Sequence, residues 1–158
     1  MRVGRDEACL ARVSKGFARP LKRRHQQTVK KPRKCATSEF VVLVVEDDLA
    51  VLNSLTFSLE IEGFKVHGHA TGEELLNSDN LADCDCFIVD QKLPGMSGLE
   101  LIAKLRDRHI DTPAILITSH PSSWLRKRAE KADIPIVEKP LLGNTLLDRI
   151  HDVRRNRL

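Results

Sequence analysis

Aromatic side chains and long apolar runs are scarce in this chain of 158 residues. It has no tyrosine and one tryptophan, and because aromatic residues make up only 4% of it, its core must be mainly aliphatic. No stretch approaches the roughly 18 consecutive apolar residues of a membrane-spanning helix, and no apolar segment of the signal-peptide type occurs. The length allows one domain of ordinary size plus an appendage. We expect a soluble, cytoplasmic protein with no membrane partner.

Cysteine is also sparse, with four residues at positions 9, 35, 84 and 86. Only Cys84 and Cys86 are closely spaced, and a single C-x-C pair without a second pair is a weak signal for zinc. We therefore expect ordinary reduced, half-buried thiols, with Cys84 and Cys86 on the same side of the start of a strand.

Acidic residues are nearly missing from the first quarter of the chain. Residues 1–38 carry 12 Lys/Arg against Asp6 and Glu7, a net charge of +10, whereas residues 39–158 carry 14 against 20, a net charge of −6. Because the domain itself is acidic, a duplex-binding surface on it is disfavoured.

The basic segment 1–38 lacks helical or strand periodicity and is typical of a disordered arm. Three interpretations of it stay open. It is a solvated tail without a specific role, including one from a start codon assigned too far upstream; or it contacts nucleic acid or another anionic surface; or it is a targeting segment. The two acids and the low serine content oppose the last interpretation.

Strands and helices alternate from Phe40 onward. The expected strands are 40–45, 64–70, 86–89, 114–117 and 134–137. The expected helices are 50–61, a short one opened by a capping box at 71–74, 99–108, one capped by Ser122 or Ser123, and one carrying Leu146, Ile150 and Val153. Two helix faces should be buried, one with Leu52, Leu55 and Leu59 and the other with Leu125, Ala129 and Ala132.

All of these strands except the second are continuously apolar, as in a parallel sheet covered on both faces. Right-handed crossovers between them give an α/β fold, a doubly wound five-stranded parallel sheet. The ligand crevice of such a sheet lies at the carboxyl ends of its strands.

Chemically useful side chains follow four of the strands. Glu46 and Asp47 follow the first, Asp90 the third, Thr118 the fourth and Lys139 the fifth. Carboxylates are hard oxygen ligands that suit Mg²⁺, and an aspartate between a buried strand and a Pro-Gly loop suits a carboxylate nucleophile. Together these groups predict a site that handles a phosphoryl group and a divalent metal.

Simpler interpretations exist for each residue of this set. Asp47 or Asp48 caps the following helix, Asp90 is a solvated acid at a strand end, and Lys139 is a surface charge. Pro140 opposes the last one, because proline biases the preceding residue toward extended backbone, which can aim the lysine along the edge.

These segments resemble the response-regulator receiver domain of two-component signalling. The resemblance spans about Phe40 to Val153 and rests on the motifs VLVVEDD, FIVDQKLPGMSGLE, ILITS and VEKP. It implies a flavodoxin-like, CheY-like sheet with strand order 2-1-3-4-5 and helices on both faces.

The resemblance also implies residue roles. Asp90 would accept a phosphoryl group from a phosphohistidine on a sensor histidine kinase or a histidine phosphotransfer protein. Lys139 would contact that group, and Thr118 would move toward it as the switch residue. The implied Mg²⁺ ligands are Glu46, Asp47, Asp90 and the backbone carbonyl of Lys92.

Three residues depart from the family pattern. Glu46 replaces the commoner aspartate, Leu141 stands where phenylalanine often follows the Lys-Pro pair, and Ile136 replaces an aromatic residue that usually swings inward as the switch residue moves. Since an isoleucine cannot rotate in this way, a receiver-fold binding module that works without phosphorylation is an alternative function.

The expected domains are an arm at 1–38, a receiver at 39–153 and a short basic tail at 154–158, which is too short for a DNA-binding output domain. We expect a non-enzymatic protein that docks on an unknown downstream partner or acts as a phosphoryl relay or sink. A phosphatase is disfavoured because Lys92 stands where such enzymes need a second aspartate. Nucleic acid is expected as a partner only through the arm.

Two further groups of side chains have open interpretations. Arg126, Lys127, Arg128 and Lys131 make one helix strongly basic, which is either a solvated face or a partner surface. His67 and His69 alternate onto one face of an edge strand, where we expect solvent exposure rather than metal binding.

Overall fold

The computed structural model describes residues 39–141 and 143–156. The predicted arm at 1–38 and the cysteines at 9 and 35 lie outside the described residues. Within the described part, no helix has the length and apolarity of a membrane span.

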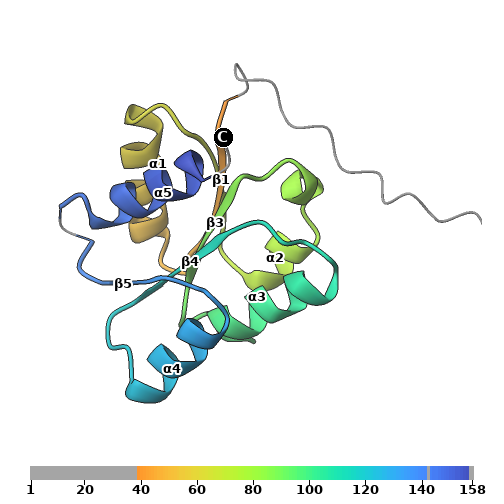
Figure 1. Ribbon diagram of the computed structural model, residues 1–158. Helices are drawn as coiled ribbons and strands as arrows, with labels where there is room; N and C mark the ends of the chain where they lie inside the picture. The colour runs from red at the N-terminus through yellow and green to blue at the C-terminus, as the bar shows by residue number, and fades with distance from the viewer. Residues whose placement is uncertain (1–38, 142, 157–158) are drawn as a thin grey trace, which may run out of the picture. The chain divides into compact units, whose positions relative to one another are not determined.

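Five parallel strands form one sheet in the order β2-β1-β3-β4-β5 (Figure 1). They are β1 (Val41–Val45), β2 (Lys65–His69), β3 (Cys86–Asp90), β4 (Ala114–Thr118) and β5 (Ile136–Glu138). Every residue of β1, β3 and β4 is buried, which explains their unbroken apolar sequences. The predicted fold class and strand order are confirmed.

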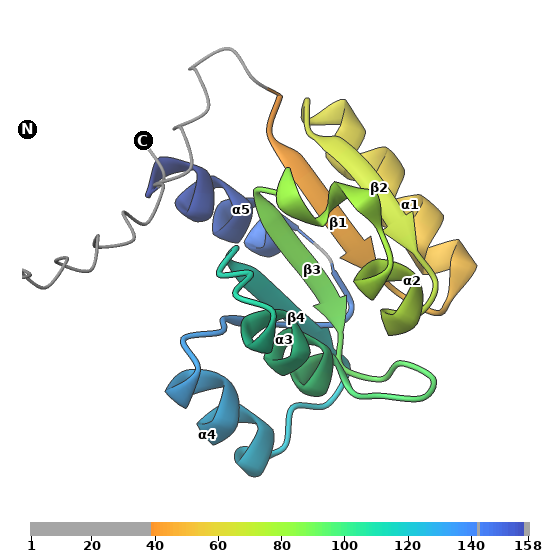
Figure 2. The same ribbon diagram turned by 90° about the vertical axis from the view of Figure 1, so that its right-hand side faces the viewer.

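Helices cover both faces of this sheet. They are α1 (Leu49–Ile61), α2 (Gly72–Leu76), α3 (Gly98–Asp107), α4 (Ser123–Lys131) and α5 (Thr145–Arg155), with a short 3₁₀ helix, η1 (Asp79–Ala82), that the sequence did not predict. Figure 2 shows, together with Figure 1, that α1 and α5 lie on one face and α2, α3 and α4 on the other. Helix α5 includes the first two residues of the predicted tail at 154–158.

Each face of the sheet has its own aliphatic core. The first contains the predicted α1 face of Leu52, Leu55 and Leu59 together with Leu146 and Ile150 of α5. The second is filled from α2, α3 and α4, and includes Leu125 and Ala129. The prediction of a buried Ala132 is wrong, because α4 ends at Lys131 and Ala132 is an exposed C-cap residue.

Two predictions about strand ends are also wrong. The last strand was expected at 134–137, but only Ile136–Glu138 pair with β4. Cys84 and Cys86 are fully buried, and they lie on opposite sides of the sheet, in the two separate cores. Strand β3 begins only at Cys86, so the alternation of a strand does not extend back to Cys84.

Two smaller predictions, the capping box of α2 and the exposure of the β2 histidines, also differ from the structure. Thr71 caps α2 as predicted, but the carboxylate of Glu74 accepts a hydrogen bond from the backbone N–H of Ala70 rather than from that of the cap residue. His67 and His69, expected in solvent, are partly buried.

Candidate functional site

Strand register brings the predicted site residues to one edge of the sheet. Val45 of β1 lies opposite Val89 of β3, so the next residues, Glu46 and Asp90, are neighbours at the carboxyl ends of adjacent strands. Thr118 ends β4, the other neighbour of β3. These residues therefore lie at the edge of the sheet where a doubly wound fold is expected to bind its ligand.

Asp90 is held at both carboxylate oxygens. Its side chain is buried, with the residue only 4% exposed. Oδ2 accepts a hydrogen bond of 2.7 Å from the backbone N–H of Lys92, and Oδ1 forms an ion pair of 2.8 Å with Nζ of Lys139. A carboxylate offers about four lone-pair sites, so each oxygen keeps a lone pair for another ligand or electrophile.

Lys139 joins the two buried acids. Its Nζ lies 2.7 Å from Oε2 of Glu46 as well as 2.8 Å from Asp90, and its backbone N–H donates to the carbonyl of Thr118 at 2.8 Å. Burial alone would lower the pKa of Lys139, but its hydrogen bonds to the carboxylates of Asp90 and Glu46 outweigh burial and raise it. The lysine is thus a charged group, and its bond to Pro140 is cis.

The pKa of Glu46 is also raised, which for a carboxyl group favours the neutral form. Its residue is only 2% exposed, and this burial raises the pKa of its carboxyl, while the nearby charge of Asp90 raises it further. The hydrogen bond from Lys139 opposes both effects. A second cation at this position would therefore favour the ionised form of Glu46.

Three carboxylates make a cluster suited to a metal ion. Ligand oxygens of Glu46, Asp47 and Asp90 all lie within 4.8 Å of one another, with the first and last residues buried and Asp47 exposed. Hard oxygen ligands with one open side fit Mg²⁺, which retains waters and shares phosphate oxygens. The residues present therefore fit the predicted metal.

Of the two acids offered as helix caps, Asp48 rather than Asp47 caps α1. Asp48 accepts hydrogen bonds from the backbone N–H groups of Ala50 at 2.9 Å and Val51 at 3.2 Å, and so caps α1. Asp47 belongs to the metal cluster instead. The adjacent acids thus divide into one structural and one candidate ligand residue.

For Thr118 and Lys92 the structure shows backbone contacts to the site. Thr118 is buried, with its backbone joined to Lys139, while Lys92 is exposed and contacts Asp90 through its N–H. The switch role of the Thr118 hydroxyl and the metal-ligand role of the Lys92 carbonyl stay predictions.

Gly98 is a site residue whose role the sequence did not predict. A Cβ atom at this position would lie 2.4 Å from the backbone oxygen of Asp90 and 2.8 Å from Cδ1 of Leu116. Only glycine lets the start of α3 approach the end of β3 so closely. The signal was the glycine that ends the Pro-Gly-Met-Ser-Gly loop, which composition identified only as a loop.

Comparison with known families agrees with this geometry. A family profile described as the response regulator receiver domain matches residues 42–151. The chain belongs to the response regulator receiver domain family. Receiver domains are phosphoacceptor signalling modules rather than catalytic enzymes, and they partner with histidine kinases.

Curated relatives of this receiver are longer proteins. It is 33% identical over 116 residues to nodulation protein W of Bradyrhizobium diazoefficiens, covering 73% of this chain and 51% of the relative. It is 32% identical over 114 residues to the transcriptional regulatory protein FixJ of Rhizobium meliloti, covering 72% and 56%. The chain thus spans about half the length of the curated relatives it matches.

Solved receiver structures match it over nearly their whole length. A CheY-like response regulator receiver domain protein from Methanospirillum hungatei has a TM-score of 0.69 and 28% identity, covering 76% of this chain and 97% of that one. The crystal structure of FixJ-N has a TM-score of 0.66 and 30% identity, covering 75% of this chain and 95% of that one. These matches establish the receiver fold of the chain.

Proposed function

We propose that Asp90 accepts a phosphoryl group from a phosphohistidine of a sensor histidine kinase or a histidine phosphotransfer protein. The observation that carries this proposal is the buried Asp90 carboxylate, fixed by the Lys92 N–H and the Lys139 ammonium at the open edge of the sheet. In the reaction a carboxylate oxygen of Asp90 bonds to phosphorus while the bond from phosphorus to the imidazole nitrogen breaks. The electron pair of that bond leaves with the imidazole.

The residues around Asp90 have distinct roles in this proposal. Lys139 contacts both buried acids and is the proposed partner of a phosphoryl oxygen on Asp90. The hydroxyl of Thr118 is the proposed donor to a second oxygen. Glu46, Asp47 and Asp90, with the Lys92 carbonyl, are the proposed Mg²⁺ ligands, and the bound ion would offset the negative charge of the transferred group.

We further propose that the phosphodonor docks on α1. Three of its apolar side chains are largely exposed, Leu49 at 62%, Phe57 at 66% and Ile61 at 68%, and no charged residue occurs from Leu49 to Leu59. An exposed apolar face of this kind marks an interaction surface.

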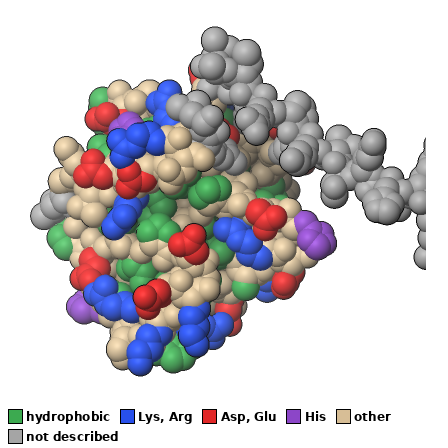
Figure 3. Space-filling view, viewed as in Figure 1, with side chains coloured by type: hydrophobic (Ala, Val, Ile, Leu, Met, Phe, Trp, Pro, Cys, Tyr) green, Lys and Arg blue, Asp and Glu red, His purple; other side chains and the backbone are tan. Residues whose placement is uncertain are grey.

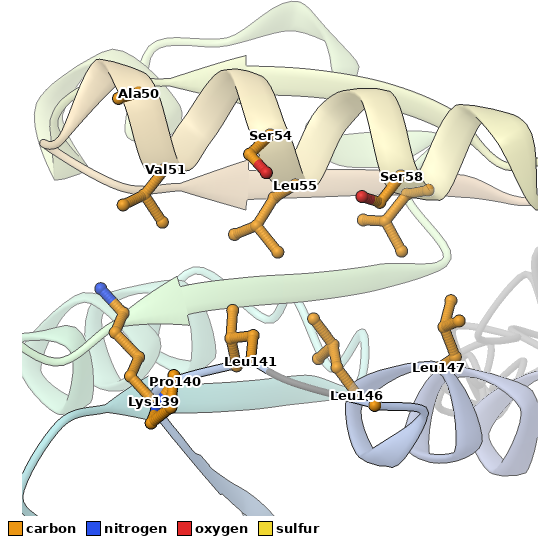
Figure 4. A pocket seen from close by; sticks show the side chains of 12 residues that line it. Ala50, Val51, Ser54, Leu55, Ser58, Lys139, Pro140, Leu141, Leu146 and Leu147 are labelled. Carbon is orange, nitrogen blue, oxygen red and sulfur yellow. The ribbon is translucent and has the colours of Figure 1, made fainter.

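A groove beside this helix leads to the site. It has a volume of about 590 Å³ and lies between α1 and the segment from Lys139 to Leu147. Figure 4 shows the side chain of Lys139 at the same end of the groove as Ala50 and Val51. A donor seated along α1 would therefore have its phosphohistidine next to the lysine that contacts Asp90.

Acetyl phosphate with Mg²⁺ tests the phosphoacceptor role. We expect it to label the protein covalently, and we expect Asp90→Asn to abolish the label. Asp111→Asn, which alters an exposed acid outside the site, is the matched control and should be labelled normally. Undiminished labelling of the Asp90→Asn variant would remove Asp90 from its assigned role.

Ile136 favours one alternative function, a receiver-fold module that binds its partner without phosphorylation. Ile136 is partly buried against the core that also contains Leu125 of α4, so no aromatic ring is available at this position to rotate. The phosphoacceptor proposal predicts docking on a downstream partner, or phosphoryl relay, that responds to beryllofluoride. Partner binding with the same affinity in the presence and absence of this phosphoryl mimic would favour the alternative.

A further inference from the structure

Helix α4 carries a charge that is opposite to that of its domain. Its nine residues hold four Lys/Arg and one Glu, whereas residues 39–158 as a whole have a net charge of −6. Basic side chains accordingly gather at the lower edge of Figure 3, over α4. A concentrated positive patch on an acidic domain is a local feature that its overall composition does not predict.

Four residues of α4 form one stripe. Trp124, Lys127, Arg128 and Lys131 are spaced i, i+3, i+4 and i+7, so they share a face of the helix. All four are exposed, and the large apolar ring of Trp124 is 59% exposed. We call this set the α4 stripe.

The indole ring of the α4 stripe is held in place by a neighbour. The guanidinium carbon of Arg128 lies 4.8 Å from the centroid of the Trp124 ring, within the range of a cation–π contact. A cation–π contact favours one arrangement of the two side chains over others. An exposed aromatic ring that is already ordered loses less conformational entropy when a partner covers it.

The α4 stripe does not face β5. Arg126, on the other side of the helix, forms an ion pair with Glu138 at the end of β5. Leu125 and Ala129 of α4 pack into the core, so Arg126 and the stripe lie on opposite flanks of the helix. The stripe therefore points away from β5, and within residues 39–141 and 143–156 neither Lys127 nor Lys131 forms a salt bridge.

We propose that the α4 stripe is the docking surface for an acidic protein partner that covers Trp124 with apolar side chains. Charge complementarity favours an acidic partner, because two lysines and Arg128 share the face of Trp124. The exposed ring is desolvated favourably only by an apolar surface. Aromatic and arginine side chains are also the commonest binding hot spots in protein interfaces. This surface is independent of the phosphoacceptor role of Asp90.

Other occupants fit the α4 stripe less well. A symmetric second copy would place one stripe against another and bring like charges together. A nucleic acid duplex would extend beyond a stripe about 10 Å long onto a domain that is otherwise acidic, which would repel its phosphates. A local acidic patch on a protein avoids both penalties.

Trp124 itself reports on binding at the stripe. Because the chain has one tryptophan and no tyrosine, the indole emission of the full-length protein comes from this residue alone. The probe is a synthetic helical peptide that presents glutamates around leucine. We expect it to cause a saturable shift of the emission to shorter wavelength that weakens as salt is added.

Charge reversal tests whether the stripe binds this probe. Lys127→Glu with Lys131→Glu should weaken probe binding at least about tenfold. Arg149→Glu with Arg154→Glu changes the net charge equally at exposed positions of α5 and should leave the affinity within about twofold. Matching urea unfolding curves would show that both double variants fold. The basic segment 1–38 also attracts the peptide, but only binding at the stripe changes the emission of Trp124.

Three results would overturn the proposal. The first is an equal loss of affinity in both double variants, and the second is equally tight binding of the peptide with glutamine in place of glutamate. The third is a duplex DNA that shifts the Trp124 emission at lower concentration than the peptide does, which would assign the stripe to nucleic acid.

Discussion

Helices α1 and α4 flank the same edge of the sheet and differ in charge and in the polarity of their exposed side chains. Helix α1 follows the strand that leads to Glu46, and it has no charged residue from Leu49 to Leu59. Helix α4 follows the strand that ends in Thr118, and five of its nine residues are charged. A partner held by apolar burial tolerates salt, whereas one held by charge does not. The two sides of one site are therefore suited to partners of different chemistry.

The largest expected effect separates docking on α1 from the chemistry at Asp90. Phe57→Glu with Ile61→Glu should reduce phosphotransfer from the cognate kinase at least about 30-fold, since two exposed apolar anchors are lost. Labelling by acetyl phosphate should change less than about twofold, because this small donor needs no docking surface. Trp124→Glu on α4 is the matched control. The rate of radiolabel transfer is measured for the unchanged protein, the α1 double variant and the α4 variant. Equal losses in the α1 and α4 variants would remove the distinction between the two helices.

The site was easier to predict from the sequence than the surfaces beside it. Asp90 and Glu46 were predictable because buried strands have continuous apolar sequences, and parallel strands bring the residues that follow them to one edge. Phe57 and Ile61 were not, because an apolar residue in a helix gives the same signal whether it faces the core or solvent.

Other features depended on tertiary packing. The role of Gly98 arises from the backbone oxygen of Asp90, eight residues away, which no local pattern indicates. The side on which Cys84 lies depended on where pairing of β3 begins, and the ends of β5 depended on pairing with β4. Local sequence predicts which elements form, whereas their ends follow from their partners.

An intermediate effect is expected in the pH dependence of Mg²⁺ affinity, which should follow the ionisation of Glu46 on the α1 side of the site. Burial raises the pKa of Glu46 above its ordinary value of 4.5, and Mg²⁺ binding requires the deprotonated carboxylate. Affinity for Mg²⁺ should therefore have its full, constant value above the raised pKa, where Glu46 is ionised. Below this pKa the affinity should fall roughly tenfold per pH unit. Calorimetric titration with Mg²⁺ at several pH values measures this dependence.

Matched variants assign that pH dependence to one side of the site. Glu46→Gln should bind Mg²⁺ more weakly at neutral pH and should lose the decline that begins above pH 4.5. Thr118→Val on the α4 side removes a hydroxyl that does not titrate in this range, so its pH profile should follow that of the unchanged protein. An unaltered profile in Glu46→Gln would assign the decline to another group.

The smallest expected effect compares the starts of the two helices. Asp48 caps α1 through two backbone N–H groups, at 2.9 and 3.2 Å, whereas the Ser122 hydroxyl caps α4 through one, that of Leu125 at 3.1 Å. Replacing either residue by alanine should lower the free energy of unfolding by about 1 kcal/mol. The loss should be larger for Asp48→Ala, by roughly 0.5 kcal/mol, because its negative charge also interacts with the positive end of the helix dipole.

Urea unfolding of four variants measures this difference. Asp48→Asn and Ser122→Thr keep a side-chain acceptor and should recover most of each loss. Added salt should narrow the gap between Asp48→Ala and Ser122→Ala, since it screens the charge of Asp48 but not a neutral hydrogen bond. A larger loss for Ser122→Ala would reverse the order and show that the charge of Asp48 does not determine the difference between the two caps. Because Asp48 is outside the metal cluster, Asp48→Ala should also retain its affinity for Mg²⁺, so that stability and metal binding vary independently on the α1 side.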